Sequence, residues 1–390
     1  MHVTDIELIP VAIPTRPVDE PLGLAPYIGG PAIGATAPQL TFEEALTACE
    51  HVGRERRATL VRLETDAGVT GWGELAATDP IQRSIVEERI APILQDRPVW
   101  NIEGFVREAA PAGYGRDYLM TIGGVELALW DAMGKAADRP VYELLGGKCV
   151  DRVPVAFCLG LLSPDRSAKK AEEARAHGFD VLKTKASRYW RTDVERLIAM
   201  HEAVDGQLSF RVDPNCEWSV GDAVNVGAAL ADAGVRLEYL EQPIAVDSFG
   251  SLARLRNRLT QPIAINEDAY LPGNLFQAVK ADAIDAAVVD CHPIGGLHRM
   301  RQLAGVVAEA NISMAHHSGH DLGLKNAAKA HLAAAIPEFD LAMDATYYAA
   351  DGDILAEPLV IEDGSMAVPE RPGLAGDVDH AAIERYRIDG

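Results

Sequence analysis

Polar or charged residues close a series of short apolar segments at nearly regular intervals along the second half of the chain. Successive members lie 23 to 28 residues apart, and they are Lys185, Asp213, Glu241, Glu267, Asp290, His317 and Asp344. Each interval has the length of one strand, one helix and two short loops. An apolar segment at 153–158 extends the series backwards, which gives eight predicted strands. The spacing therefore predicts a (β/α)8 barrel, whose functional residues gather where the strands end.

Helical patterns fill the intervals between these strands. The predicted helices are 167–177, 194–204, 220–233, 248–259, 274–279, 296–310 and 325–335. No full helix of this type follows Asp344, and 353–369 has the pattern of strands and turns. We therefore expect the tail to leave the barrel and to pack on the N-terminal part of the chain.

The N-terminal part does not follow the barrel spacing. Strands are predicted at 6–13, at 58–65 and after a turn at 68–74, and helices at 42–57, 80–94 and 101–109. Strands followed by helices favour an α+β domain. The predicted division is an α+β domain at 1–125, the barrel at 126–350 and the returning tail at 351–390.

One loop in the N-terminal part has an unusual composition. Residues 23–34 are rich in Gly and Pro and include a single aromatic residue, Tyr27. Such a loop fits either a linker or a mobile cover over a site, and both interpretations stay open. If it covers the site, Tyr27 is a candidate for substrate contact.

Charge and cysteine content limit the classes of partner. A net charge of −22 over 390 residues argues against nucleic acid or an anionic membrane surface. Five cysteines without a C-x-x-C pair fit reduced thiols in a cytoplasmic protein. No apolar run approaches the roughly 18 residues of a membrane span, and the first residues lack the pattern of a signal peptide. We expect a cytoplasmic protein that acts on a small molecule.

Two lysines of one predicted strand, Lys183 and Lys185, point to the same side because strand residues i and i+2 share a face. Two ammonium groups held close together disfavour each other's protonation, so one can serve as a base near neutral pH. The alternative is a pair of solvated lysines on an edge strand.

Three acids close three successive predicted strands: Asp213, Glu241 and Glu267. Neighbouring strands lie about 4.8 Å apart, so these end groups can converge on one ion. Three hard oxygen ligands suit Mg²⁺. The alternative is that each acid caps the helix that follows it.

Asp290 and His317 close the next two strands. A carboxylate beside an imidazole fixes its tautomer and supports its charged form, as in a general acid/base pair. His316 lies next to His317, and only the spacing favours His317. The lysines and this pair are expected to face each other across the metal. Proton transfer to an α-carbon would make the enzyme a racemase or epimerase, whereas proton transfer to a leaving hydroxyl would make it a dehydratase.

At these residues the chain resembles the enolase superfamily, and within it the mandelate racemase and glucarate dehydratase branch. The motifs that carry the resemblance are Val-Thr-Gly-Trp-Gly-Glu74, Ala128-Leu-Trp-Asp131, Leu-Leu-Gly-Gly147, the strand with Lys183 and Lys185, and the metal acids. The resemblance implies an α/β fold, namely a (β/α)7β TIM-type barrel with an N-terminal α+β capping domain completed by the C-terminal tail. It also implies Mg²⁺, a carboxylate substrate and a homo-oligomer.

Several site residues are assigned by this resemblance. Lys185 is implied as the base with Lys183 as its partner, and Asn215, His292 and Asp344 lie in motifs similar to those of glucarate dehydratases. That pattern would use Asn266 as the third metal ligand, whereas the racemase pattern would use Glu267; we favour Glu267 for its charge.

Two departures bear on the substrate and on a related reaction. Gly319 stands where glucarate dehydratases carry an asparagine, which argues against glucarate itself. Muconate cycloisomerases would need a lysine near Asp290, and that stretch has none.

The sequence thus predicts a Mg²⁺-dependent lyase that dehydrates a sugar acid or related hydroxy acid. The alternative is a racemase or epimerase that uses the same groups. A third hypothesis, from another class, is a metal-binding barrel without catalysis.

Overall fold

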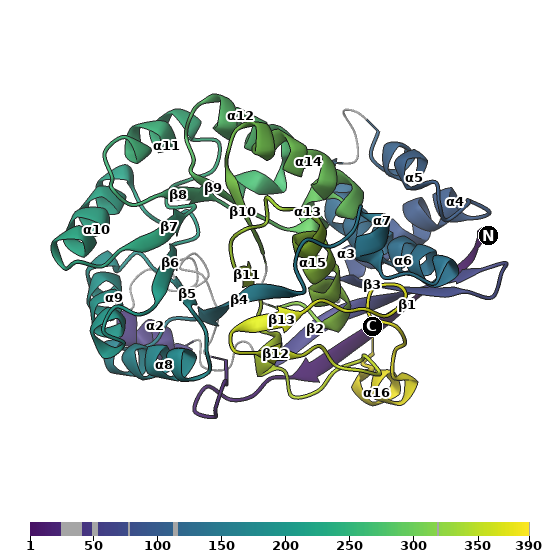
Figure 1. The fold of residues 1–390 in the computed structure, drawn as a ribbon, viewed down its shortest axis with the longest axis horizontal. Helices are drawn as coiled ribbons and strands as arrows, with labels where there is room; N and C mark the ends of the chain where they lie inside the picture. The colour runs from purple at the N-terminus through teal and green to yellow at the C-terminus, as the bar shows by residue number, and fades with distance from the viewer. Residues whose placement is uncertain (25–40, 49–53, 77–78, 112–115, 318–319, 390) are drawn as a thin grey trace.

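The computed structural model describes residues 1–24, 41–48, 54–76, 79–111, 116–317 and 320–389. The Gly- and Pro-rich loop falls largely outside these ranges, as do Tyr27 and Gly319. Figure 1 shows a ring of strands surrounded by helices, with a smaller sheet and its helices at one side.

The N-terminal domain contains a three-stranded antiparallel sheet in the order β1-β2-β3. Its strands are β1 (Val3–Pro14), β2 (Glu55–Thr65) and β3 (Thr70–Leu75). Its helices are α2 (Phe42–Ala48), α3 (Pro80–Ile85), a π-helical turn η1 (Val86–Ile90), α4 (Ala91–Leu94) and α5 (Ile102–Ala109). The predicted helix 42–57 was wrong at its end, because 55–57 pair with β1 as strand.

The barrel contains eight parallel strands among the described residues. They are β4 (Arg152–Leu159), β5 (Val181–Lys185), β6 (Ser209–Asp213), β7 (Leu237–Glu241), β8 (Ile263–Ile265), β9 (Ala286–Val289), β10 (Ser313–His316) and β11 (Met343–Asp344). Neighbours pair in sequence order from β4 to β10, and β11 pairs in parallel with β4. The amide of Leu341 donates to the carbonyl of Met314 and links the last two strands. The barrel prediction is confirmed.

Seven helices connect these strands on the outside of the ring. They are α8 (Pro164–Ala176), α9 (Trp190–Ala203), α10 (Val220–Asp232), α11 (Phe249–Arg256), α12 (Pro272–Lys280), α14 (Leu297–Glu309) and α15 (Gly323–Ala335). Two short turns, η3 (Asp268–Tyr270) and α13 (Cys291–Ile294), follow β8 and β9. Each predicted barrel helix is present, with ends that move by a few residues.

The tail returns to the N-terminal domain in two steps. The hairpin β12 (Ile361–Glu362) and β13 (Ser365–Ala367) first adds antiparallel to barrel strand β4. Helix α16 (His380–Tyr386) then packs on β1, and the amide of Ile388 donates to the carbonyl of Pro10. The tail therefore joins the barrel to the capping sheet, as the resemblance implied.

Helix α6 (Leu119–Ala137) packs against β3 and ties the N-terminal domain to the barrel, and the short α7 (Val141–Leu144) follows it. The approach is close enough to require glycine on both sides. A Cβ at Gly73 would lie 2.5 Å from the carbonyl oxygen of Gly124, and one at Gly124 would lie 2.6 Å from that of Glu74. The predicted domain boundary at 125/126 falls inside α6.

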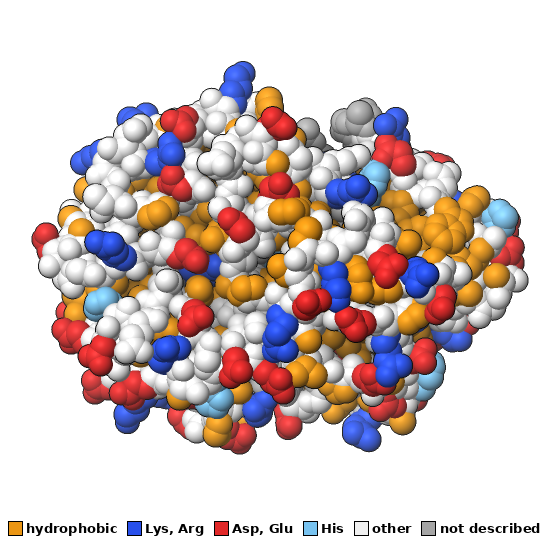
Figure 2. Space-filling model, in the orientation of Figure 1, with side chains coloured by type: hydrophobic (Ala, Val, Ile, Leu, Met, Phe, Trp, Pro, Cys, Tyr) orange, Lys and Arg blue, Asp and Glu red, His pale blue; other side chains and the backbone are white. Residues whose placement is uncertain are grey.

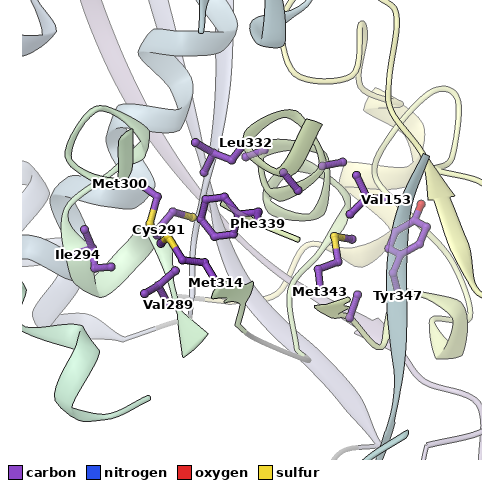
Figure 3. Packing of buried hydrophobic residues seen from close by; sticks show 14 of the residues in the cluster. Val153, Val289, Cys291, Ile294, Met300, Met314, Leu332, Phe339, Met343 and Tyr347 are labelled. Carbon is purple, nitrogen blue, oxygen red and sulfur yellow. The ribbon is translucent and has the colours of Figure 1, made fainter. Parts of the chain in front are cut away.

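Apolar packing is continuous from the N-terminal domain into the barrel. Figure 3 shows part of it behind β9 and β10, where Val289, Cys291 and Met314 lie near Met300 and Phe339. The N-terminal domain and the barrel therefore share one hydrophobic core. A separate small cluster surrounds Tyr239, which is fully buried.

On the face shown in Figure 2, acidic and basic side chains are interspersed rather than separated into large areas of one sign. None of the described helices combines the length and the apolar character needed to cross a lipid bilayer.

Candidate active site

The carboxyl ends of the barrel strands bring the predicted site residues together. Lys185, Asp213, Glu241 and Asp344 are the last residues of β5, β6, β7 and β11. The remaining predicted strand-end residues lie just beyond their strands: Asn266 and Glu267 after β8, Asp290 after β9 and His317 after β10. Because the barrel strands are parallel, their carboxyl ends lie at one mouth and bring these side chains to it.

Lys183 lies at the centre of this group and is fully buried. Its Nζ lies 2.6 Å from Oε1 of Glu241, 2.7 Å from Oδ2 of Asp344 and 3.5 Å from Oδ2 of Asp213. The other oxygen of Asp344 accepts from Nη1 of Arg211 at 3.1 Å. Asp344 is thus held by two cations and has no exposed surface. A substrate contact for Asp344 stays a prediction that this burial does not support.

Lys185 forms the second lysine contact, with Nζ 2.6 Å from Oδ2 of Asp213. Burial acts to raise the pKa of Asp213, but Lys185 and Lys183 outweigh it and hold that pKa well below its usual range. Burial, and then the neighbouring Asp213 carboxylate, raise the pKa of Glu241 to about 8. The raised value reflects crowded negative charge that the two lysines do not fully balance.

Glu267 and Asn266 have different surroundings, although they are adjacent in sequence. Nδ2 of Asn266 donates to the carbonyl of Val288 at 3.0 Å, and its Oδ1 accepts from Oη of Tyr270 at 3.2 Å. Oε1 of Glu267 accepts from Nδ2 of Asn215 at 2.8 Å. The Asn266 amide is therefore occupied by the protein on both sides, whereas Glu267 has one oxygen left over.

Unpaired buried oxygens mark the place where a cation would fit. Among the described residues, Oε2 of Glu241, Oε2 of Glu267 and Oδ1 of Asn215 are buried and have no hydrogen-bond partner. Buried oxygens without a partner are costly, and Mg²⁺ takes hard oxygen ligands of this kind. In the part of the chain that the structure describes, no three Asp, Glu, His or Cys side chains form a ready ligand cluster. The donor chemistry fits the ion, although lysine ammonium groups hold Asp213 and one oxygen of Glu241.

Asp290 and His317 meet on the opposite side of the mouth. Nδ1 of His317 lies 3.5 Å from Oδ2 of Asp290, longer than a good hydrogen bond. Burial lowers the pKa of His317, and the nearby Asp290 carboxylate opposes that shift. His316 instead stacks on Phe339 at 3.8 Å between ring centroids and is buried. The geometry therefore brings His317, and not its neighbour, to the carboxylate.

His292 is fully buried at the start of the turn after β9. Its backbone amide donates to Oδ1 of Asp290 at 2.9 Å, and its ring nitrogens have no hydrogen-bond partner among the described residues. Burial lowers its pKa to about 3. Substrate contact by His292 stays a prediction that its position does not support.

Two residues near the site were not predicted from the sequence. Lys325, in the first turn of α15, places its Nζ 2.9 Å from Oδ2 of Asp290. The ring of Tyr270 lies 6.2 Å from that of His317, between centroids. The sequence pattern marked Lys325 only as the first residue of a predicted helix. Tyr270 lies three residues after Glu267 and therefore does not fit the spacing of the strand ends.

Three buried acids hold the capping domain against the barrel. Glu74 accepts from the backbone amides of Leu322 and Lys325 at 2.7 and 3.0 Å, and thereby caps helix α15. Glu126 accepts in the same way from the amides of Leu297 and His298, at the start of α14. The third acid, in the middle of α6, is Asp131, whose oxygens accept from the amides of Trp72 and Leu374.

An α+β cap on a (β/α)7β barrel whose strand ends carry lysines, carboxylates and a histidine is the architecture of enolase-superfamily enzymes. Residues 166–382 match the family model described as enolase C-terminal domain-like. Residues 37–146 match the N-terminal domain of mandelate racemase / muconate lactonizing enzyme. The chain belongs to the mandelate racemase/muconate lactonizing enzyme family.

Relatives of known name catalyse several reactions. The chain is 28% identical to arabinonate dehydratase of Saccharolobus solfataricus over 337 aligned residues. The alignment covers 83% of this chain and 89% of the relative. The chain is 27% identical to the N-succinyl-L-Arg/Lys racemase of Bacillus cereus, over 70% of this chain and 75% of the relative. It is 32% identical to muconate cycloisomerase 1-1 of Acinetobacter lwoffii, over 68% and 70%.

The fold is shared with solved structures over nearly the whole chain. A crystal structure of an enolase from Streptomyces coelicolor superimposes with a TM-score of 0.83 at 29% identity, covering 99% of this chain and 96% of that one. The fold and the family are thus established.

Proposed function

We propose that this enzyme removes the α-proton of a sugar acid or related hydroxy acid and eliminates its β-hydroxyl, to give a 2-keto acid. The observation that carries the proposal is the strand order: Lys185 ends β5 and Asp290 follows β9, four strands further round the eight-stranded barrel. Groups at such positions can supply a base to one face of a small carboxylate and an acid to the other. The similarity to an arabinonate dehydratase supports elimination as the outcome.

We further propose that Asp213, Glu241 and Glu267 hold Mg²⁺. The unpaired oxygens of Glu241 and Glu267 and the raised pKa of Glu241 support this ligand set. Glu267 is preferred to Asn266 because the Asn266 amide already binds Val288 and Tyr270. When bound, Mg²⁺ would orient the substrate carboxylate and offset the negative charge that develops as the α-proton leaves.

The chain's own groups divide the remaining work. Lys185, as the neutral amine, accepts the α-proton; a cation bound to Asp213 would compete for the carboxylate that otherwise pairs with this lysine. Lys183 stays paired with Glu241 and Asp344 and places its positive charge beside Lys185. His317 delivers a proton to the β-hydroxyl, which leaves as water, and the resulting enol becomes the 2-keto acid.

A racemase or epimerase is the alternative, and the same two faces would serve it. In that reaction His317 would return a proton to the α-carbon, as expected if the chain acted like its Bacillus cereus relative. Incubation with a library of hydroxy acids in D₂O separates the reactions. A 2-keto acid indicates dehydration, and α-deuterium without loss of water indicates racemisation or epimerisation.

Two variants test the assigned roles. We expect Lys185→Ala and His317→Asn each to lower kcat by at least about 10²-fold, while circular dichroism shows an unchanged fold. Lys169→Ala, on the outer helix α8, is the matched lysine control and keeps full activity. A near wild-type rate in either site variant would rule out the role given to that residue.

A further inference from the structure

The carboxylate of the catalytic pair is shared with a second cation. Oδ2 of Asp290 lies 3.5 Å from Nδ1 of His317 but only 2.9 Å from Nζ of Lys325. The other oxygen, Oδ1, accepts from the amide of His292. Both oxygens are therefore engaged by groups other than the imidazole, and the shorter contact is to the lysine.

Lys325 is held in place from several directions. Its side chain is 1% exposed, and its Nζ also lies 2.8 Å from Oδ1 of Asp321. Its backbone amide donates to Glu74 of the capping domain. Burial acts to lower the pKa of Lys325, but the carboxylates of Asp290 and Asp321 together outweigh burial and hold that pKa well above its usual range. The buried ammonium therefore stays charged.

The effect on His317 follows from simple electrostatics. A carboxylate supports an imidazolium only to the extent that its charge is not already balanced. Burial acts to raise the pKa of Asp290, but Lys325, His317 and His292 together hold that pKa well below its usual range, so the carboxylate stays ionised but is already paired. Among the described residues, the charged or titratable groups around His317 include Asp290 after β9, Lys183 on β5, Asp344 on β11 and Tyr270 of η3.

We propose that Lys325 is a positioning residue of the catalytic pair: its buried ammonium shares Asp290 with His317, fixes the carboxylate and limits the support that this carboxylate gives to the charged imidazole. The inference rests on the proposed function, because it concerns the same His317. It adds a residue that the strand-end pattern does not include. It also connects the capping domain to the chemistry through Glu74.

The neighbouring lysine of the same helix provides a matched control. Lys329 lies one turn further along α15, is also buried, and pairs with Asp321 at 2.8 Å and with the carbonyl of Asp344. Its ion pair is with Asp321, whereas the ion pair to Asp290 comes from Lys325. Lys325→Met and Lys329→Met therefore remove the same charge from the same helix, and only the first removes the contact with the catalytic carboxylate.

The experiment follows the protonation of His317 directly by NMR. Protein labelled with ¹⁵N-histidine is titrated at constant MgCl₂, and the His317 signals are identified by their loss in His317→Asn. We expect a midpoint below 6.5 in the wild type and a rise of about 1 to 2 units in Lys325→Met. Lys329→Met should move the midpoint by less than half of that shift, and Lys325→Arg should restore the wild-type value.

The proposal is overturned if the midpoint in folded Lys325→Met stays at the wild-type value, or if Lys329→Met moves it equally. If Lys325→Met does not fold by circular dichroism, Lys325→Gln carries the same expectation and the same refutation. Where a substrate is available, the pH profile of kcat/KM should shift in the same direction. The NMR readout needs no turnover, so failure of the proposed reaction and failure of this inference are separate outcomes.

Discussion

Replacing Asp131 by asparagine tests whether one buried carboxylate holds the capping domain, helix α6 and the tail together. Asp131 has no exposed surface. Its Oδ2 accepts from the amide of Trp72 on β3 at 2.8 Å and lies 2.7 Å from Nζ of Lys135. Its Oδ1 accepts from the amide of Leu374 in the tail at 2.8 Å. Asparagine keeps the shape, so no cavity adds to the effect.

The expected cost follows from these contacts. The asparagine side chain has one acceptor, so either Trp72 or Leu374 must face an amide donor. A buried N–H without a partner costs about 1–3 kcal/mol. The bonds that remain lose their charge assistance, at about 1 kcal/mol, and relief from burying the charge offsets part of this. We expect the free energy of unfolding to fall by about 2–4 kcal/mol.

Urea unfolding followed by circular dichroism measures this change. The matched control is Asp222→Asn, which alters an exposed carboxylate in the capping box of α10, where Oγ of Ser219 donates to Asp222. That substitution should cost less than about 1 kcal/mol. A loss for Asp131→Asn no greater than that of the control would refute the reasoning.

Two further predictions concern pH and metal. Burial raises the pKa of Glu126 from 4.5 to about 7, so its contribution to stability is full below pH 4.5 and is lost as the pH rises through 7. From pH 5 to 8 the wild type should lose about 3 kcal/mol more than Glu126→Gln, and parallel urea midpoints would contradict this. MgCl₂ should raise the melting temperature of Glu267→Gln less than that of the wild type. It should raise the melting temperature of Asn266→Ala, compared with the same variant without metal, by as much as in the wild type. A smaller rise in Asn266→Ala than in Glu267→Gln would assign the ligand to Asn266.

The sequence predicted the architecture well because the barrel is built from repeated local units. Each unit needs a strand, a helix and two short loops, so the strands run parallel and their carboxyl ends, from β5 to β10, lie at one mouth. The predicted helix 42–57 failed at 55–57, where pairing with β1 determines the structure. Local helical preference cannot anticipate a partner strand that lies some 40 residues away along the chain.

Within the site, the sequence determined which residue types share the mouth. The tertiary structure decided which of two adjacent residues points to the site. His316 and His317 have the same chemistry; the strand spacing favoured His317, and the structure stacks His316 on Phe339 and places His317 beside Asp290. Asn266 and Glu267 are distinguished by Val288 and Tyr270, which occupy the amide.

The contact between Lys325 and Asp290 depends on how α15 docks under the capping domain. Glu74 caps the start of that helix although it lies about 250 positions earlier in the chain. Periodicity reports which face of an element a residue occupies, whereas such a contact depends on the relative placement of elements that no local pattern encodes. The sequence by itself therefore determined the barrel and the set of groups at its mouth, and only the folded structure decided how those groups pair.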